Sequence, residues 1–199
     1  MLESILELNE LLKRVFVMKR LALSLAASML CAIAIPTTPA FADESTEALV
    51  TARDAAAQGR DDMVAAFGKN ELKAGQYLWR DAGDAIGEPR VVINLTDQTA
   101  YLYRGDTLVA VSSVSTGRDG HPTPIGIFPV LAKKTMHKSK KYDDAPMPYM
   151  QRLDDYGIAM HAGNLPGYPA SHGCVRLPAG FAKKLFAVTR TGTEVVIGS

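Results

Sequence analysis

The chain has 199 residues, enough for one globular domain with additional segments. Its hydrophobic content of 47% and charged content of 22% are typical of a globular protein that carries an extra apolar segment. The formal net charge is +1, so overall charge provides no attraction to nucleic acid or to an anionic membrane surface, and we expect no nucleic-acid partner.

The N-terminus has the pattern of an export signal, which we place at residues 18–42. A basic Met-Lys-Arg start precedes an apolar run at 21–35, and the segment ends in Ala-Phe-Ala, a small-x-small cleavage site. The run is too short to span a bilayer comfortably, so we expect cleavage before Asp43 and no stable membrane insertion afterwards. Translation is expected to start at Met18, which makes residues 1–17 extra. The sequence thus predicts a periplasmic protein.

The chain divides into three segments: residues 1–42 with the signal peptide, a helical adaptor or linker at 43–89, and a catalytic domain at 90–199. The adaptor is rich in alanine and charged residues at loosely helical spacing. We predict one or two short helices there, interrupted near Gly59, and a short strand or irregular lead-in over 72–80. No catalytic motif occurs in this segment.

From residue 90 the pattern is that of short strands. Three stretches separated by tight turns predict a β-meander over 91–115, and a fourth strand is expected over 125–132, where Pro129 marks an edge or a bulge. A helix is predicted over 178–190 and a last strand over 193–197.

The segment 133–155 is basic and then rich in proline and methionine, without clear periodicity. Long excursions of this kind often form lids or binding loops. We interpret it as a long loop that covers a substrate strand, with a solvated loop as the alternative.

The features that carry chemistry gather in the segment 161–176. It contains His161, His172 and Cys174 among glycines and prolines. The only other cysteine, Cys31, lies in the predicted signal peptide, so the mature protein has one thiol and no intrachain disulfide. A single cysteine in an exported protein indicates a reactive thiol or an intermolecular bridge.

A thiol becomes a good nucleophile when a nearby base or cation favours its thiolate form. His172 is two residues from Cys174 and, in an extended loop, points in a different direction. His161 ends a predicted short strand, and the glycines and prolines that follow let the loop turn back. We therefore interpret His161 as the base and His172 as a residue that braces the loop.

The same loop can supply oxyanion donors. Gly173 allows close approach of the backbone, so that the N–H groups of His172, Gly173 and Cys174 can point to one place. The hydroxyl of Ser171 can orient an imidazole or the loop. This constellation favours acyl transfer through a thioester.

Two motifs carry a family resemblance. Ser171–Arg176 reads Ser-His-Gly-Cys-Val-Arg, with His161 upstream, and a second segment, Val114–Phe128, contains Ser-Thr-Gly followed by Thr-Pro-Ile-Gly-Ile-Phe. Together they resemble the L,D-transpeptidases, the YkuD domain family, over about residues 90–198.

The resemblance implies a mostly β fold: a YkuD-type β-sandwich with a helix after the active-site loop, here preceded by the short N-terminal helical segment. It implies a cysteine-dependent acyltransferase without metal or organic cofactor. Its partners would be peptidoglycan stem peptides: Cys174 would attack a donor tetrapeptide and release D-alanine. A second stem's amine would then resolve the thioester into a 3–3 cross-link. Some members attach a lipoprotein instead, exchange the terminal D-amino acid, or hydrolyse such bonds.

The resemblance also implies roles for single residues. His161 would accept and donate the proton, and the backbone carbonyl of Ala162 would set its tautomer. Arg176, where many members have asparagine, would grip a stem carboxylate or hold the loop to a neighbouring acid. Thr123 and Tyr149 are further candidates for substrate binding.

Two alternatives stay open at this stage. His161, His172 and Cys174 are all permitted zinc ligands, which would make the protein a zinc-dependent envelope hydrolase. Cys174 can also be a buried small residue in a non-catalytic wall-binding scaffold, as free cysteines often are.

Overall fold

The computed structural model describes residues 42–81, 83 and 85–199, which belong to one compact unit. The predicted start at Met18 and all but the last residue of the predicted signal peptide lie outside the described residues. Among the helices that are described, none has the length and apolar character needed to cross a membrane.

The described residues form a mostly β structure, as predicted. The elements follow the order α2 (Thr46–Phe67), β1 (Tyr77–Trp79), β2 (Pro89–Asn94), β3 (Thr99–Arg104), β4 (Thr107–Ser113), β5 (Gly126–Pro129), β6 (Ala132–Lys138), β7 (Pro146–Arg152), β8 (Ala159–Ala162), β9 (Val175–Leu177), α3 (Ala179–Val188) and β10 (Glu194–Gly198).

The larger sheet has six strands in the order β1-β4-β3-β2-β10-β5. The meander β2–β3–β4 is antiparallel, as its short turns predicted, and β10 lies parallel to β2 and antiparallel to β5. Pro129 ends β5, which is an edge strand, and this confirms the expected edge position. The predicted fourth strand is wrong beyond that point: Ala132 already belongs to β6 in the other sheet.

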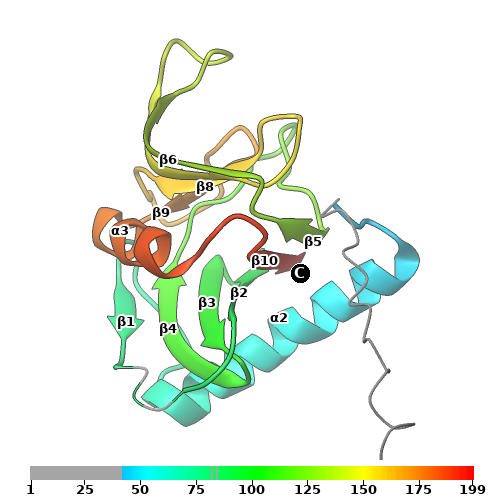
Figure 1. Ribbon diagram of the computed structural model, residues 1–199, viewed down its shortest axis with the longest axis vertical. Helices are drawn as coiled ribbons and strands as arrows, with labels where there is room; N and C mark the ends of the chain where they lie inside the picture. Colours follow the sequence, from blue (N-terminus) through cyan, green and yellow to red (C-terminus); the bar gives the residue numbers. More distant parts are fainter. Residues whose placement is uncertain (1–41, 82, 84) are drawn as a thin grey trace, which may run out of the picture. The chain divides into compact units, whose positions relative to one another are not determined.

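The smaller sheet has four strands in the order β6-β7-β8-β9. The segment 133–155, expected to be a long loop, is mostly the antiparallel hairpin β6–β7, whose tip projects at the top of Figure 1. The pattern hid this strand because most residues of β6 are exposed or only half-buried, which removes the alternation expected of a strand with one buried face.

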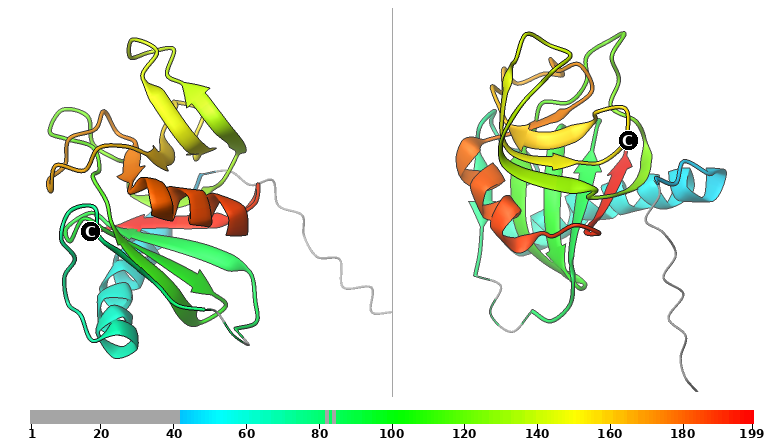
Figure 2. Two further views of the ribbon diagram at one scale, coloured as in Figure 1. Left: turned by 90° about the vertical axis from the view of Figure 1, so that its left-hand side faces the viewer. Right: turned by 45° about the horizontal axis from the view of Figure 1, so that its top comes forward.

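The main core lies between the two sheets and includes α3, which Figure 2 shows in the middle layer. The helix contributes Phe181, Ala182 and Leu185, all fully buried. The aromatic rings of Tyr77 and Trp79 in β1 each lie 5.8 Å from the ring of Phe181. The predicted helix after the active-site loop is confirmed, and it ties the smaller sheet to the larger one.

α2 covers the opposite face of the six-stranded sheet and forms a second core with it. The predicted break near Gly59 is wrong, because one helix continues from Thr46 to Phe67. Gly59 is buried against Tyr101, and a Cβ at this position would lie 2.6 Å from Cδ2 of that ring. The glycine therefore serves close packing of the helix on the sheet and does not end the helix.

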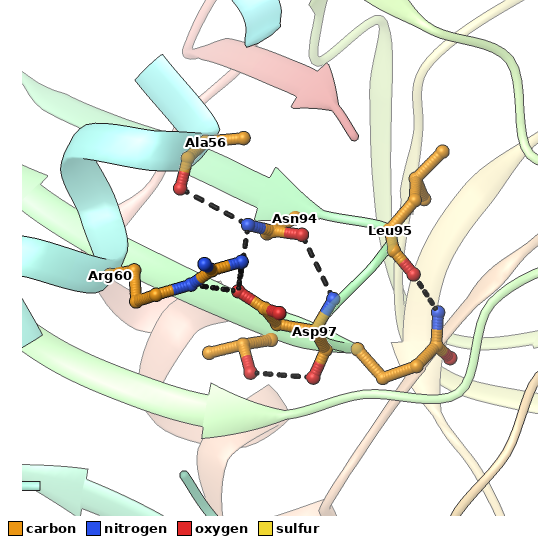
Figure 3. A network of polar contacts seen from close by, with 7 residues as sticks. Ala56, Arg60, Asn94, Leu95 and Asp97 are labelled. Carbon is orange, nitrogen blue, oxygen red and sulfur yellow. Dashed lines mark hydrogen bonds and ion pairs between the residues drawn. The ribbon is translucent and has the colours of Figure 1, made fainter. Parts of the chain in front are cut away.

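A polar network also fastens α2 to the turn after β2 (Figure 3). Asn94 donates to the carbonyl of Ala56 in the helix at 3.2 Å and to Asp97 at 3.0 Å. Arg60 forms an ion pair with Asp97 at 2.6 Å. Residues 43–89 thus contribute α2 and β1 to the same compact unit as the strands that follow.

Candidate active site

The pairing of β8 with β9 brings the predicted catalytic residues to one face of the smaller sheet. The strands are parallel, with His161 opposite Arg176, and the alternate residues of both strands point into the main core. His161 and Arg176 therefore face the other side, and Cys174, two residues before Arg176, faces the same way. All three line one pocket of about 1310 Å³, which the β6–β7 hairpin also borders.

The loop before β9 needs glycine at position 173. Gly173 has φ 107°, a conformation that side chains rarely adopt, and a Cβ there would lie 2.6 Å from Cδ1 of Ile158. The close approach places the Ile158 turn directly beside the loop that carries Cys174.

The two sequence motifs meet in space. Ser115 and Arg176 exchange two backbone hydrogen bonds, at 3.0 and 2.9 Å. The hydroxyl of Thr123 accepts from the N–H of Gly117 at 2.9 Å and donates to the carbonyl of Gly173 at 2.8 Å. Thr123 is buried, and its hydroxyl holds the two loops together. It was expected to bind substrate, but it does not line the pocket.

The hydroxyl of Ser171 engages the N–H of Gly173, one of the three groups expected to stabilise an oxyanion. Its hydroxyl accepts from the N–H of Gly173 at 3.1 Å and donates to the carbonyl of Cys174. Among the described residues, no hydrogen-bond acceptor is recorded for the N–H groups of His172 and Cys174. These two groups are therefore the ones left to meet a developing negative charge.

His161 is set up to accept a proton. Its ring is almost fully buried, and Nδ1 lies 2.8 Å from the carbonyl oxygen of Ala162. Because a carbonyl only accepts, Nδ1 carries the hydrogen and Nε2 presents its lone pair. Burial lowers the pKa of His161, against the Ala162 hydrogen bond that raises it, and the Arg176 charge lowers it further. The imidazole is therefore neutral at pH 7.

Cys174 rests as a thiol. Burial raises its pKa and so does the carboxylate of Asp154, while a hydrogen bond from the Ala159 backbone and the charge of Arg176 lower the pKa only in part. Sγ has a long contact of 3.6 Å to the carbonyl of Gly157. From the sequence we expected the base His161 to favour the thiolate form of Cys174, whereas the environment of both groups favours the neutral pair until a substrate enters.

His172 lies at the rim of the pocket in a cluster of rings and cations. Its Nε2 accepts a hydrogen bond from the Arg118 guanidinium at 2.7 Å. Its ring stacks on Tyr142 with 4.4 Å between centroids, and His121 approaches at 4.7 Å. Sequence reasoning missed Arg118 and Tyr142 because they come from two loops that only the fold brings together. Arg118 and the exposed His121 share one turn, whereas Tyr142 lies at the tip of the β6–β7 hairpin.

The two remaining substrate-binding candidates differ in position. The aliphatic part of the Arg176 side chain lies over Gly163, so that a Cβ on Gly163 would lie 3.0 Å from Cγ of Arg176. No described acid forms an ion pair with the Arg176 guanidinium. Tyr149 has φ 56° and its ring packs on Phe186 at 5.9 Å, at the edge of the main core. The structure therefore does not bring Tyr149 to the pocket, since the left-handed backbone turns it inward.

The zinc alternative needs three ligands in one place. Within residues 42–199, apart from the two that are not described, no group of three or more His, Cys, Asp or Glu side chains could hold a metal ion. In addition, the Nε2 atom of His172 is engaged by Arg118.

Fold and site together define a two-sheet domain with a cysteine and a histidine at one pocket. The model of the YkuD family, the L,D-transpeptidase catalytic domain, matches residues 88–197, more than half of the chain. The chain belongs to this family.

Solved structures show the same fold. An L,D-transpeptidase from Stackebrandtia nassauensis is 26% identical, with a TM-score of 0.53 over 71% of this chain and 63% of that one. An L,D-transpeptidase from Mycobacterium smegmatis is 19% identical, with a TM-score of 0.52 over 56% and 59%. L,D-transpeptidase 3 from Mycobacterium tuberculosis, in complex with a faropenem-derived adduct, is 22% identical, with a TM-score of 0.51 over 56% and 61%. The chain thus spans less than two thirds of each of these structures, and no curated protein sequence matches it significantly.

Proposed function

We propose that this protein is an exported L,D-transpeptidase that transfers an acyl group between peptidoglycan stem peptides, with Cys174 as nucleophile and His161 as base. One observation carries the proposal: in a chain of the YkuD family, His161 in β8 and Cys174, directly before the paired strand β9, line the same pocket. The export pattern at residues 18–42 supports a site of action in the periplasm.

In the first step Cys174 attacks the carbonyl of the diaminopimelate L-centre in a donor tetrapeptide. The thiol proton moves to Nε2 of His161 as the C–S bond forms, and the oxyanion meets the free N–H groups of His172 and Cys174. The bond to the terminal D-alanine then breaks, and its nitrogen takes the proton from His161. The product is a thioester on Cys174 and free D-alanine.

In the second step an amine attacks the thioester carbon. A C–N bond forms, the C–S bond breaks, and His161 passes the proton of the amine to the sulfur. A second stem peptide supplies this amine in a 3–3 cross-link, and a lipoprotein is the alternative acceptor. The first step starts from the neutral thiol–imidazole pair and the second step restores it, so the enzyme returns to its resting state without a cofactor.

The shape of the site supports a peptide donor. The β6–β7 hairpin borders the pocket with apolar residues such as Met147 and Met150, which suit an extended peptide. No described acid forms an ion pair with the guanidinium of Arg176. This guanidinium can therefore bind a carboxylate of the stem peptide.

The direct test uses purified protein and defined muropeptides, with the products read by mass spectrometry. We expect release of D-alanine and a product joined through two diaminopimelate residues, or an amide to an added lipoprotein. Cys174→Ala should be folded and inactive. Wild-type protein that binds muropeptides without changing them would favour the wall-binding scaffold, and zinc-dependent hydrolysis would favour the metal site.

A further inference from the structure

We propose that Arg118, held in place by His172 and assisted by Lys141, binds the carboxylate of the acceptor at the rim of the pocket. This inference rests on the proposed transferase function and deepens it: it assigns the acceptor as an α-amino acid unit whose amine and carboxylate share one carbon.

The position of Arg118 is fixed relative to the nucleophile. Its backbone N–H donates to the carbonyl of Ser171 at 3.1 Å, and its carbonyl accepts from His121 at 2.9 Å. Its guanidinium then donates one N–H to Nε2 of His172 at 2.7 Å. The side chain is thus tied at both ends to the loop that carries Cys174, and most of its N–H donors remain free.

The cluster around His172 contains cationic side chains. Burial and the cations Arg118, Arg176 and Lys141 lower the pKa of His172, so its ring stays neutral and offers Nδ1–H as a donor. Lys141 lies over the ring of Tyr142, which itself stacks on His172. Among the described residues, no carboxylate forms an ion pair with Arg118, Lys141 or Arg176.

The arrangement along the chain assigns the ligand. His172, which holds the guanidinium of Arg118, lies two residues before Cys174, and Arg176 lies two residues after it. One arginine is therefore attached to the loop on each side of the nucleophile. Arg176 is assigned to the donor stem under the proposed function. The Arg118–His172 pair is then free for the second reactant.

The chemistry of that reactant fits the pair. The side-chain amine of diaminopimelate and the amine of a free D-amino acid each have a carboxylate on the same carbon. A guanidinium that holds this carboxylate would place the amine against the thioester carbon, which lowers the entropic cost of the second step.

The test compares two acceptors on the acylated enzyme: a D-amino acid and its carboxamide, which lacks the carboxylate. We expect wild type to prefer the D-amino acid, as measured by the ratio of kcat/KM for the two acceptors. In Arg118→Gln this ratio should fall roughly tenfold, the loss of one charge-assisted hydrogen bond. Arg118→Lys should retain part of the preference, and Lys141→Gln, on the other side of the cluster, should lower the ratio by a smaller factor.

Arg53→Gln provides the matched control. Arg53 is exposed on α2, so this substitution removes the same charge at a position away from the pocket. It should leave the ratio unchanged. A ratio that stays the same in Arg118→Gln and Lys141→Gln, while the thioester still forms, would overturn the carboxylate subsite alone. Failure of the wild type to form any acyl adduct on Cys174 would overturn the proposed function itself, and the subsite with it.

Discussion

Two residues, Cys174 and His161, are both held in their neutral forms. Burial raises the pKa of the thiol and lowers the pKa of the imidazole, so proton transfer between them is unfavourable in the empty pocket. The neutral thiol is protected from oxidation and from reaction with unwanted acyl donors, because the thiolate is the reactive form. Proton transfer from Cys174 to His161 becomes favourable only when a substrate displaces water and presents its carbonyl to the free N–H groups.

The charge of Asp154 contributes to this resting state and can be tested by substitution. Its carboxylate accepts the N–H groups of Gly157 and Ile158, each at 2.8 Å, and it raises the pKa of Cys174. Asp154→Asn keeps an acceptor oxygen and removes the charge, so the thiolate becomes easier to form. The pH at which alkylation of Cys174 reaches half its maximal rate should lie above that of an ordinary thiol in wild type and should move down in Asp154→Asn. Asp61→Asn, on α2, should have no effect, and a midpoint that moves upward in Asp154→Asn would show that the charge plays another role.

Among the elements, α2 and the β6–β7 hairpin show where sequence patterns succeed and fail. The meander was predictable because apolar and β-branched runs are separated by tight turns, although both faces of its strands are buried. α3 was predictable because its buried residues recur at helical spacing. Gly59 was interpreted as a helix break because glycine is a poor helix former. The helix nevertheless continues through Gly59, because the glycine allows it to pack closely on Tyr101. The hairpin was missed because β6 has no buried face.

The same distinction applies to the site. Cys174 and His161 could be proposed from residue type and local motif alone. The cluster around His172 could not, because the turn with Arg118 and His121, the hairpin tip with Tyr142 and the loop with His172 meet only after the chain folds. Tyr149 was misplaced because nothing in the sequence marks its left-handed backbone.

The contact between α2 and the sheet predicts the sign of a stability change. Gly59→Ala gains about 1 kcal/mol of helix propensity, but its Cβ would clash with the Tyr101 ring, and overpacking of this kind costs about 1–3 kcal/mol. We expect a net loss in the free energy of unfolding, measured by chemical denaturation. In a Tyr101→Leu background the clash is gone, so the same substitution should be neutral or stabilising. Equal effects in both backgrounds would mean that the ring does not limit the helix.

For the molecule as a whole, the pocket depends on the two sheets cooperating. Ser115, two residues after the end of β4 in the six-stranded sheet, pairs with Arg176 beyond the nucleophile, and the smaller sheet supplies His161 and the hairpin wall. The pocket is therefore lined by parts of the chain that are far apart in sequence.

Shortening the hairpin tests its part in binding. Lys138 pairs with Pro146, so replacing residues 139–145 by Asn-Gly would close the hairpin with a two-residue turn. This removes the tip that lines the pocket, and we expect KM for the donor stem peptide to rise by roughly tenfold, about 1.4 kcal/mol of lost binding. Acylation by a small β-lactam should change less, because it does not reach the tip. Unchanged steady-state kinetics with the stem peptide would remove the hairpin from substrate binding.

The decisive measurement is the rate at which faropenem acylates the protein, followed as a mass increase of the intact chain and mapped to a residue by peptide digestion. The proposed roles require a single adduct on Cys174 in wild type, none in Cys174→Ala, an acylation rate reduced by about a hundredfold or more in His161→Ala, and a much smaller reduction in a folded His172→Ala. An adduct elsewhere, or a folded protein in which His172→Ala alone abolishes acylation while His161→Ala reacts normally, would show that the nucleophile or the base has been wrongly assigned.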